Sequence, residues 1–251
     1  QIKVKPLTRI RSEKIDEAAS LLTYHFPERH LDSNLRGSFR FGATSGYRAQ
    51  EGLPLGRLSD TTEGRSRTVF NARDGRFDNF RCGGIEIVNS QISSGEQLVL
   101  EVNSNDYCSC FSMGGYGETR AKALQDAEQD VANRPSAYVT YDARRLRYAL
   151  RRQFRGLFGP SCTLVGRRVI YGTKDAVVNI PPTARIQKGN DELGHWLHIT
   201  FMKPHNFQHE EEYRLLLVDR NNLGGLSLEE QGSDRITSQD VADCIVDHGT
   251  F

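Results

Sequence analysis

Three adjacent carboxylates, Glu210, Glu211 and Glu212, run directly into the apolar segment 213–218. Aromatic and aliphatic residues of this kind favour a buried strand. Side chains two residues apart share a face of an extended chain, so we expect Glu210 and Glu212 to point to one side and Glu211 to the other. Crowding of two carboxylates at the mouth of a buried strand raises the pKa of at least one of them. The alternative is a solvated strand edge whose glutamates pair with nearby arginines.

A second group that could carry chemistry is a set of arginines expected on one helix. Asp142 is typical of a helix N-cap, and Leu146, Leu150 and Phe154 recur at the spacing of a buried helical face. The arginines of this segment are Arg144, Arg145, Arg147, Arg151, Arg152 and Arg155. Guanidinium groups at this density can bind the phosphates of RNA or DNA, and the alternative is a solvated basic face.

A third group consists of histidines close to Glu210, and it raises the question of a metal site. These are His195, His198, His205 and His209. Imidazole and carboxylate groups are zinc ligands. However, the first two lie three residues apart in a segment expected to be a strand, so they face opposite sides. The last two would converge only on a helix. We therefore expect no metal site.

Composition gives no global electrostatic argument for a nucleic-acid or membrane partner, and it indicates no membrane span. The 251 residues carry 33 Lys plus Arg against 32 Asp plus Glu, a net charge of +1, so any basic surface must be local. No apolar run approaches the roughly 18 residues that span a bilayer, and we expect no membrane partner. The five cysteines form no CxxC pair and are odd in number, which favours reduced thiols in a cytoplasmic protein.

The elements expected around these groups alternate between strand and helix. Phe39 and Phe41 share one face of a short strand, so Arg40 takes the other face, toward a cleft or toward solvent. Helices are predicted over residues 12–25, 118–133 and 238–247 and from residue 142, and strands over 106–112, 137–141, 162–171 and 196–202. Residues 106–112 have apolar side chains on both faces, which is typical of a strand buried on both sides. The pattern indicates an α+β fold in one domain, residues 1–251.

Several short motifs, taken in order, resemble an uncharacterised bacterial and phage family associated with abortive infection and phage defence. They are Phe39-Arg40-Phe41-Gly42, Tyr47-Arg48, Arg57 to Gly64, Cys108-Ser109-Cys110-Phe111-Ser112, and Lys203-Pro204 through Glu212-Tyr213-Arg214. That family is marked by a Ser-Cys-Phe-Ser strand and a late Glu-x-Glu-Tyr-Arg strand. The resemblance extends over residues 35–218.

The same order of motifs is similar to the Arg–Ser–Glu group of ADP-ribosyltransferases, for which NAD is a substrate. The resemblance implies an α+β fold of split β-sheets with flanking helices. It also implies that Arg40 holds the NAD phosphates or ribose, with Tyr47 in the same cofactor site. Ser109 or, less well, Ser112 would orient the nicotinamide ribose. These two serines lie three residues apart and face opposite ways, so the choice between them stays open.

The resemblance assigns the chemistry itself to the glutamates. Glu212 would be the catalytic acid, and Glu210 would assist the acceptor nucleophile. The roles of Asp60 and Glu63 stay open. The absence of a GxGxxG pattern agrees with NAD as a substrate and not a hydride carrier.

The resemblance therefore implies an ADP-ribosyltransferase that modifies a nucleic acid or protein, as a toxin or antiphage effector with a possible antitoxin or immunity partner. One alternative is an NAD hydrolase, in which water replaces the acceptor. Another is a catalytically silent binding module of the same fold.

Overall fold

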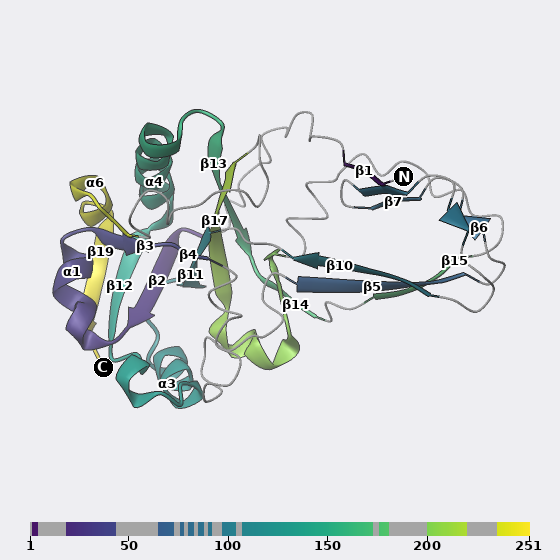
Figure 1. The fold of residues 1–251 in the computed structure, drawn as a ribbon. Helices are drawn as coiled ribbons and strands as arrows, with labels where there is room; N and C mark the ends of the chain where they lie inside the picture. Colours follow the sequence, from purple (N-terminus) through teal and green to yellow (C-terminus); the bar gives the residue numbers. More distant parts are fainter. Residues whose placement is uncertain are drawn as a thin grey trace.

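A seven-stranded antiparallel sheet forms the centre of the protein (Figure 1). The computed structural model describes residues 2–4, 19–43, 65–72, 76–77, 80–82, 85–87, 90–91, 97–103, 107–172, 176–180, 200–219 and 235–251. The strands of this sheet are β2 (Leu21–Phe26), β4 (Gly42–Ala43), β11 (Tyr107–Met113), β12 (Ala137–Asp142), β13 (Cys162–Arg168), β17 (Glu212–Asp219) and β19 (Ile245–Thr250). Their order is β13-β17-β11-β2-β12-β19, and β4 pairs with β11 beside β2. The fold is thus α+β, with a mostly antiparallel sheet and flanking helices.

Helices flank this sheet. They are α1 (Leu31–Leu35), α3 (Glu118–Ala127), α4 (Ala143–Phe158) and α6 (Gln239–Ala242), with the 3-10 helices η1 (Glu28–His30), η2 (Val131–Asn133) and η3 (His205–Glu210). The longest, α4, begins as its sequence predicts, because the Asp142 carboxylate accepts a hydrogen bond from the Arg145 backbone N–H at 2.8 Å. Leu146, Leu150 and Phe154 are buried, which confirms the expected apolar face.

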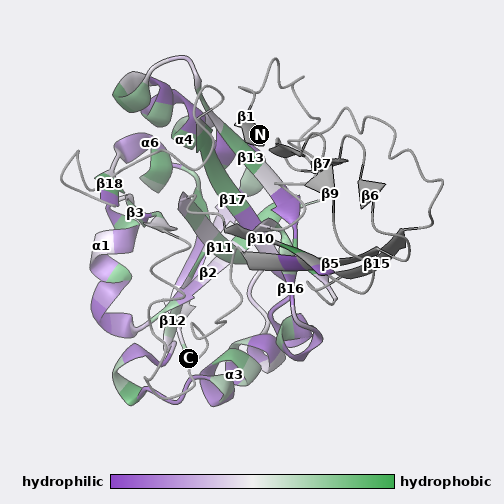
Figure 2. Ribbon diagram, turned by 45° about the vertical axis from the view of Figure 1, so that its right-hand side comes forward, coloured by the Kyte–Doolittle hydropathy of each residue, from purple (hydrophilic) through white to green (hydrophobic). Residues whose placement is uncertain are grey.

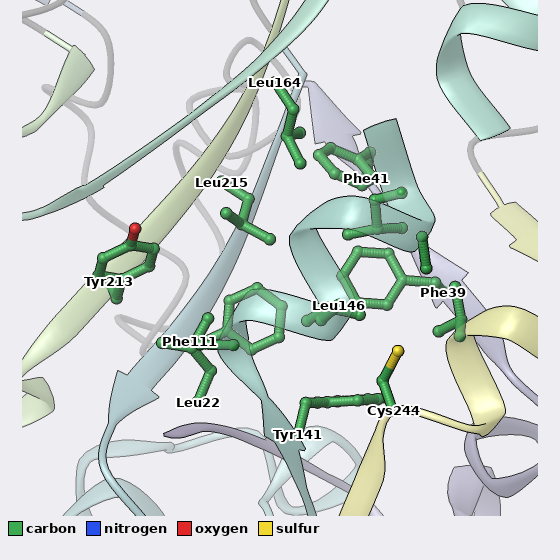
Figure 3. Close-up of a cluster of buried hydrophobic side chains, with 14 of the residues drawn as sticks. Leu22, Phe39, Phe41, Phe111, Tyr141, Leu146, Leu164, Tyr213, Leu215 and Cys244 are labelled. Atoms are coloured by element: carbon green, nitrogen blue, oxygen red, sulfur yellow. The ribbon is translucent and has the colours of Figure 1, made fainter. Parts of the chain in front are cut away.

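The main core lies between α4, the short strand β3 (Ser38–Arg40) and one face of the sheet. Phe39, Phe41 and Phe111 form its aromatic centre, and their side chains point toward one another in Figure 3. The ring centroid of Phe39 lies 5.3 Å from that of Phe41 and 5.7 Å from that of Phe111. Hydrophobic residues also run along β13 and β17 (Figure 2). Arg40 is exposed between its buried neighbours, as the alternation predicts.

Within the described ranges, five smaller sheets accompany the central one. Their strands are β3 with β18 (Arg235–Thr237); β1 (Ile2–Val4), β8 (Ile85–Ile87) and β7 (Phe80–Cys82); β10 (Gln97–Asn103), β5 (Arg65–Ala72) and β15 (Ala176–Ile180); β14 (Ile170–Tyr171) with β16 (Met202–Lys203); and β6 (Arg76–Phe77) with β9 (Ser90–Gln91). The sheet of β10, β5 and β15 extends to one side of the seven-stranded sheet in Figure 1. The single-domain interpretation stays a prediction.

Four of the predicted elements differ from the structure. The helix predicted over residues 118–133 ends at Ala127, and Val131–Asn133 form a separate 3-10 helix. Residues 21–25, predicted as the end of a helix, form the strand β2, which pairs with β11 on one side and with β12 on the other; residues 12–18 lie outside the described residues. Of the predicted helix 238–247, only Gln239–Ala242 is helical, and the strand β19 begins at Ile245. Of the predicted strand 196–202, only its last residue is shown as strand, and residues 196–199 are not described. For β2 and β19, strand pairing overrides the local helical propensity.

The edge of β11 that faces β2 and β4 is paired only at its ends. Ser112 and Met113 pair with β2, and Tyr107 and Cys108 pair with β4. Neither β2 nor β4 pairs with residues 109–111. Along its other edge β11 pairs with β17 from Tyr107 to Ser112 without interruption.

The absence of a side chain at Gly37 allows the C-terminal segment to pack closely against the residue that precedes β3. Its φ is +78°, and a Cβ at this position would overlap the carbonyl oxygen of Ser238 and lie 2.9 Å from the backbone nitrogen of Ala242. We expect Gly37→Ala to cost more stability than the about 1–2 kcal/mol of a left-handed alanine, because the new methyl group meets backbone. The control is Gly114→Ala, where φ is +85° but no atom lies within 4 Å of the added Cβ. Urea unfolding of both variants measures the difference, and equal losses of stability would show that the close approach is unimportant.

Candidate functional site

A cavity of about 210 Å³ lies beside residues 108–110 of β11. Four residues singled out in the sequence line it: Arg40 on β3, Ser109 on β11, Glu210 at the end of η3 and Glu212 at the start of β17. Its remaining wall comes mainly from β2, η1, α1 and β18. The fold thus brings together residues from segments that are far apart in the sequence.

Two carboxylates and two cations form a buried network at one end of the cavity. The Lys203 ammonium lies 2.7 Å from Glu210 Oε2 and 3.1 Å from Glu212 Oε2. The Arg214 guanidinium donates from Nε to Glu212 Oε1 at 2.5 Å. No side chain of the four is more than 7% exposed. The network has no net charge when all four groups are ionised.

A bend in the backbone brings the two carboxylates together. We expected Glu210 and Glu212 to share one face of an extended strand, and that local conformation is wrong. Glu210 ends η3, Glu211 has φ +45°, and β17 begins at Glu212. Glu211 is the one non-glycine residue with positive φ in the described part of the chain. Its side chain faces solvent and pairs with Arg120 at 3.0 Å, on the other side from the network, as expected.

Of the two carboxylates whose crowding was expected to raise at least one pKa, Glu212 has a lowered pKa. Burial by itself would raise the pKa of Glu212, but Arg214 and then Lys203 outweigh burial and hold that pKa well below its ordinary value. The neighbouring Tyr171 hydroxyl accepts a hydrogen bond from the Glu212 backbone N–H at 2.8 Å, and burial raises the pKa of Tyr171 to about 12. Glu212 is therefore a fixed carboxylate that stays ionised near neutral pH.

The lowered pKa of Glu212 predicts a loss of stability in acid. A carboxyl group with a depressed pKa in the folded state stabilises the protein fully above its unfolded pKa of about 4.3, and this contribution is lost as the pH falls through the folded value. We expect the stability difference between the wild type and Glu212→Gln to be constant from pH 7 to about 5 and to shrink below about 4.3. Urea unfolding at a series of pH values measures it, and a difference that does not change in acid would contradict the assignment.

Part of the cavity wall is basic. Arg40 and Arg235 lie directly opposite each other where β3 pairs with β18, and both line the cavity. His30 lies beside them, and its pKa is lowered first by burial and then by Arg29, Arg235 and Arg40. Arg235 belongs to none of the motifs found in the sequence. Its only sequence signal is the alternation Arg235-Ile236-Thr237, which is too short to indicate that it pairs with a strand 195 residues earlier.

The two candidate serines are placed differently. Ser109 is buried and lines the cavity. Ser112 is not among the lining residues; it lies opposite Glu212 in the strand register. Its buried hydroxyl has no hydrogen-bond partner among the described residues. Tyr47, Asp60 and Glu63 lie outside the described residues, as do His195 and His198.

The arginines of α4 divide between its buried and exposed sides. Arg147 is buried and donates to the Tyr213 hydroxyl at 3.1 Å, and Arg151 donates to the Leu164 carbonyl at 3.5 Å. Arg152 pairs with Asp240. The exposed basic side consists of Arg144, Arg145, Arg152 and Arg155, and it surrounds Tyr148, whose exposed fraction is 73%. The sequence analysis did not single out this tyrosine.

The described ranges contain neither a metal-binding cluster nor a membrane-spanning helix. No group of three or more His, Cys, Asp or Glu side chains there is arranged to hold a metal ion. His205 and His209 lie on η3 and are exposed. None of the helices in those ranges combines the length and apolar character needed to cross a bilayer.

Comparison with known proteins finds no matching family model, no matching curated protein and no matching solved structure. The resemblance to ADP-ribosyltransferases and to the antiphage family therefore stays a hypothesis. The residues that line the cavity, and the contacts between them, are the observations that bear on function.

Proposed function

We propose that the protein is an NAD-dependent ADP-ribosyltransferase and that the cavity between Arg40 and Glu212 is its NAD cleft. One observation carries the proposal: Arg40, Ser109, Glu210 and Glu212 line a single cavity. The resemblance implies split β-sheets with flanking helices, and the mostly antiparallel sheet with flanking helices is compatible with it. An activity of this kind agrees with a toxin or antiphage effector.

The roles of the carboxylates follow from the reaction. When the bond between nicotinamide and ribose breaks, the electron pair leaves with nicotinamide and positive charge develops on the ribose. The ionised, fixed carboxylate of Glu212 would stabilise that charge in a site largely shielded from water. Glu210 would accept the proton of the acceptor nucleophile as it bonds to the ribose carbon. Ser109 lines the cavity but shares the sheet face of its register partner Leu215, whereas Ser112 shares the face of Glu212, so the choice of the serine that would orient the ribose stays open.

A specific observation favours the catalytically silent alternative. Lys203 contacts both carboxylates and so neutralises part of the charge that the reaction needs. Substrate binding would have to leave the Glu212 carboxylate facing the ribose while Lys203 stays with Glu210. The transferase and the hydrolase both consume NAD, whereas the silent module does not. The hydrolase releases free ADP-ribose, and the transferase attaches it to an acceptor.

The exposed basic side of α4 supports a nucleic-acid acceptor. Arg144, Arg145 and Arg155 can neutralise phosphates, and a base can stack on Tyr148 between them. This helix packs on the sheet face that carries Leu215 and Leu217, whereas Arg214 projects from the opposite face. Contacts at α4 would thus anchor the acceptor at a distance from the reacting bond.

Charge reversal tests this surface. We expect Arg144→Glu, Arg145→Glu and Arg155→Glu together to weaken the binding of a single-stranded oligonucleotide. They should also reduce the slope of log affinity against log salt by about 0.7 for each phosphate that the variant no longer neutralises. Fluorescence anisotropy measures both, with Arg36→Glu, at the exposed end of α1, as the control. Unchanged affinity and slope in the triple variant would show that the exposed side of α4 is a solvated basic face that binds no nucleic acid.

Incubation of the protein with NAD labelled in its adenylate half, in a cell lysate, tests the proposed function. Label in nucleic acid or protein is the result expected of a transferase, and label only in free ADP-ribose would indicate a hydrolase. Intact NAD under all conditions would favour the silent module. A protein acceptor, or an antitoxin or immunity partner that blocks the label, would be identified in the same lysate.

A further inference from the structure

We infer that Glu128 binds the hydroxyl groups of the adenosine ribose of the dinucleotide and selects NAD over NADP, in which the 2′-hydroxyl of that ribose carries a phosphate. This inference deepens the proposed function and rests on it, because the ligand is the NAD for which the cavity is proposed. Glu128 belongs to none of the motifs found in the sequence, and no step of the proposed reaction uses it.

Glu128 brings a buried carboxylate to the cavity wall. It directly follows α3, lines the cavity and is 4% exposed. Its Oε1 atom accepts a hydrogen bond from the Asp130 backbone N–H at 3.0 Å. Its Oε2 atom makes no hydrogen bond or ion pair within the described part of the chain. A buried carboxylate oxygen without a donor is costly, and a ligand that supplies the donor offsets that cost.

The chain around Glu128 fixes the direction of this carboxylate. The Glu128 backbone N–H donates to the Gln125 carbonyl at 3.3 Å, and the Arg134 guanidinium donates to the Glu128 carbonyl, also at 3.3 Å. Because a carboxylate is planar, the hydrogen bond from Asp130 to one oxygen also orients the other. The acceptor is therefore held in place before a ligand arrives, which limits the ordering cost of binding.

Other polar side chains that line the cavity use their donors within the protein. The side chains of Ser33 and Asn34 both donate to the His30 carbonyl, at 2.8 and 2.7 Å. The amide group of Asn133 is bonded at its nitrogen, at 2.8 Å, and at its oxygen, at 3.1 Å. None of these donors bonds to the Glu128 carboxylate. A donor for its second oxygen is therefore left to come from the ligand.

A ribose hydroxyl is the donor that we assign to this position. In the proposed reaction the nicotinamide ribose lies at Glu212, whose carboxylate is held by Arg214 and Lys203. Glu128 makes no bond to that network and belongs to the segment between α3 and β12, which leaves it for the second ribose of the dinucleotide. A carboxylate that accepts from ribose hydroxyls forms short, charge-assisted hydrogen bonds.

The same carboxylate discriminates against NADP. A phosphate on the 2′-hydroxyl removes a donor and brings negative charge to Glu128. No cation pairs with the Glu128 carboxylate in the ranges that the structure describes, and the Arg134 guanidinium donates to the backbone carbonyl instead. Like charges brought together in a binding site suppress the wrong ligand, so the affinity for NADP should be lower than that for NAD.

Calorimetric titration of the full chain with ADP and with 2′-deoxy-ADP tests Glu128 without any cleavage. We expect the wild type to bind ADP about ten- to hundredfold more tightly, because hydrogen bonds to a charged group are lost with the hydroxyl. Glu128→Gln keeps an acceptor for the Asp130 N–H and should reduce this preference to about threefold or less. Glu118→Gln makes the same change at the exposed start of α3 and should keep the wild-type preference. Circular dichroism of each variant establishes that it is folded.

Nicotinamide release from NAD and from NADP measures the selection itself. We expect kcat/KM of the wild type to be at least about tenfold higher for NAD than for NADP. Glu128→Gln should bring the two values within about threefold of each other, because it removes the charge that repels the 2′-phosphate. A purely structural role of Glu128 would lower both values together and leave their ratio unchanged, which would contradict the inference.

Two binding results would overturn the ribose site: equal affinity of the wild type for ADP and 2′-deoxy-ADP, or an unchanged preference in folded Glu128→Gln. The same experiments separate this inference from the proposed function. A preference for ADP that Glu128→Gln removes, in a protein that cleaves no NAD, would keep the ribose site and reject the transferase. Cleavage of NAD and NADP at equal rates by both the wild type and Glu128→Gln would do the reverse.

Discussion

Glu212→Gln is expected to slow NAD cleavage on the order of 10²–10⁴-fold, because it keeps the shape of the side chain but removes the charge that stabilises the developing positive ribose. The amide has no negative charge for Arg214 and Lys203 to hold in place. The measurement is the rate of nicotinamide release at saturating NAD, with the same acceptor for each variant.

Glu211→Gln is the matched control for this prediction. It makes the same chemical change one residue away, on an exposed side chain whose pairing with Arg120 contributes little. We expect its rate and its melting temperature to be close to those of the wild type. Glu212→Gln will also be less stable, because Glu212 is buried between two cations, so rates are compared well below both melting temperatures. Equal rates for all three proteins would contradict the assignment of Glu212, and a loss confined to Glu211→Gln would mean that the wrong carboxylate was chosen.

Arg214→Met is expected to have the largest effect on stability. Arg214 is 1% exposed and also donates to the Thr200 carbonyl at 2.5 Å, so its removal leaves Glu212 buried with half of its partners. Breaking a buried ion pair from one side typically costs about 3–5 kcal/mol. Urea unfolding of Arg214→Met measures the loss.

The double variant Glu212→Gln with Arg214→Met shows whether the cost comes from the buried charge. It removes both members of the pair, so it should be more stable than the sum of the two single changes predicts by about 1–3 kcal/mol. Strict additivity of the two losses would show that Arg214 stabilises the fold by packing and by its bond to Thr200, and not by balancing Glu212.

The alternation of apolar and polar residues correctly predicted the parts of the site in which a short strand packs against the core. Phe39 and Phe41 are buried and Arg40 is exposed between them, as their spacing indicates. Strand β11 is buried on both faces, as its apolar residues on both sides indicate. The N-cap Asp142 and the buried face of α4 follow equally directly from sequence, because they depend only on neighbours within a few turns.

The features that sequence could not predict depend on distant partners. Residues 21–25 have helical spacing with the segment before them, yet they form a strand because β11 and β12 lie on either side. The bend at Glu211 replaces the extended conformation that was expected. Lys203 lies between two carboxylates, and together with Arg214 it lowers the pKa of Glu212, whereas crowding of carboxylates would raise a pKa. Arg235 reaches Arg40 only through strand pairing across most of the chain.

The most direct test of the proposed function is nicotinamide release from NAD by the purified protein, with and without cell lysate as a source of acceptor. We expect the wild type to release nicotinamide in step with the loss of NAD. Charge reversal in the basic part of the cavity wall, Arg40→Glu, should abolish release while the melting temperature stays close to that of the wild type, because Arg40 is exposed. No release by the wild type under either condition, or release at an equal rate by Arg40→Glu, would contradict the assignment of this cavity as an NAD-cleaving site.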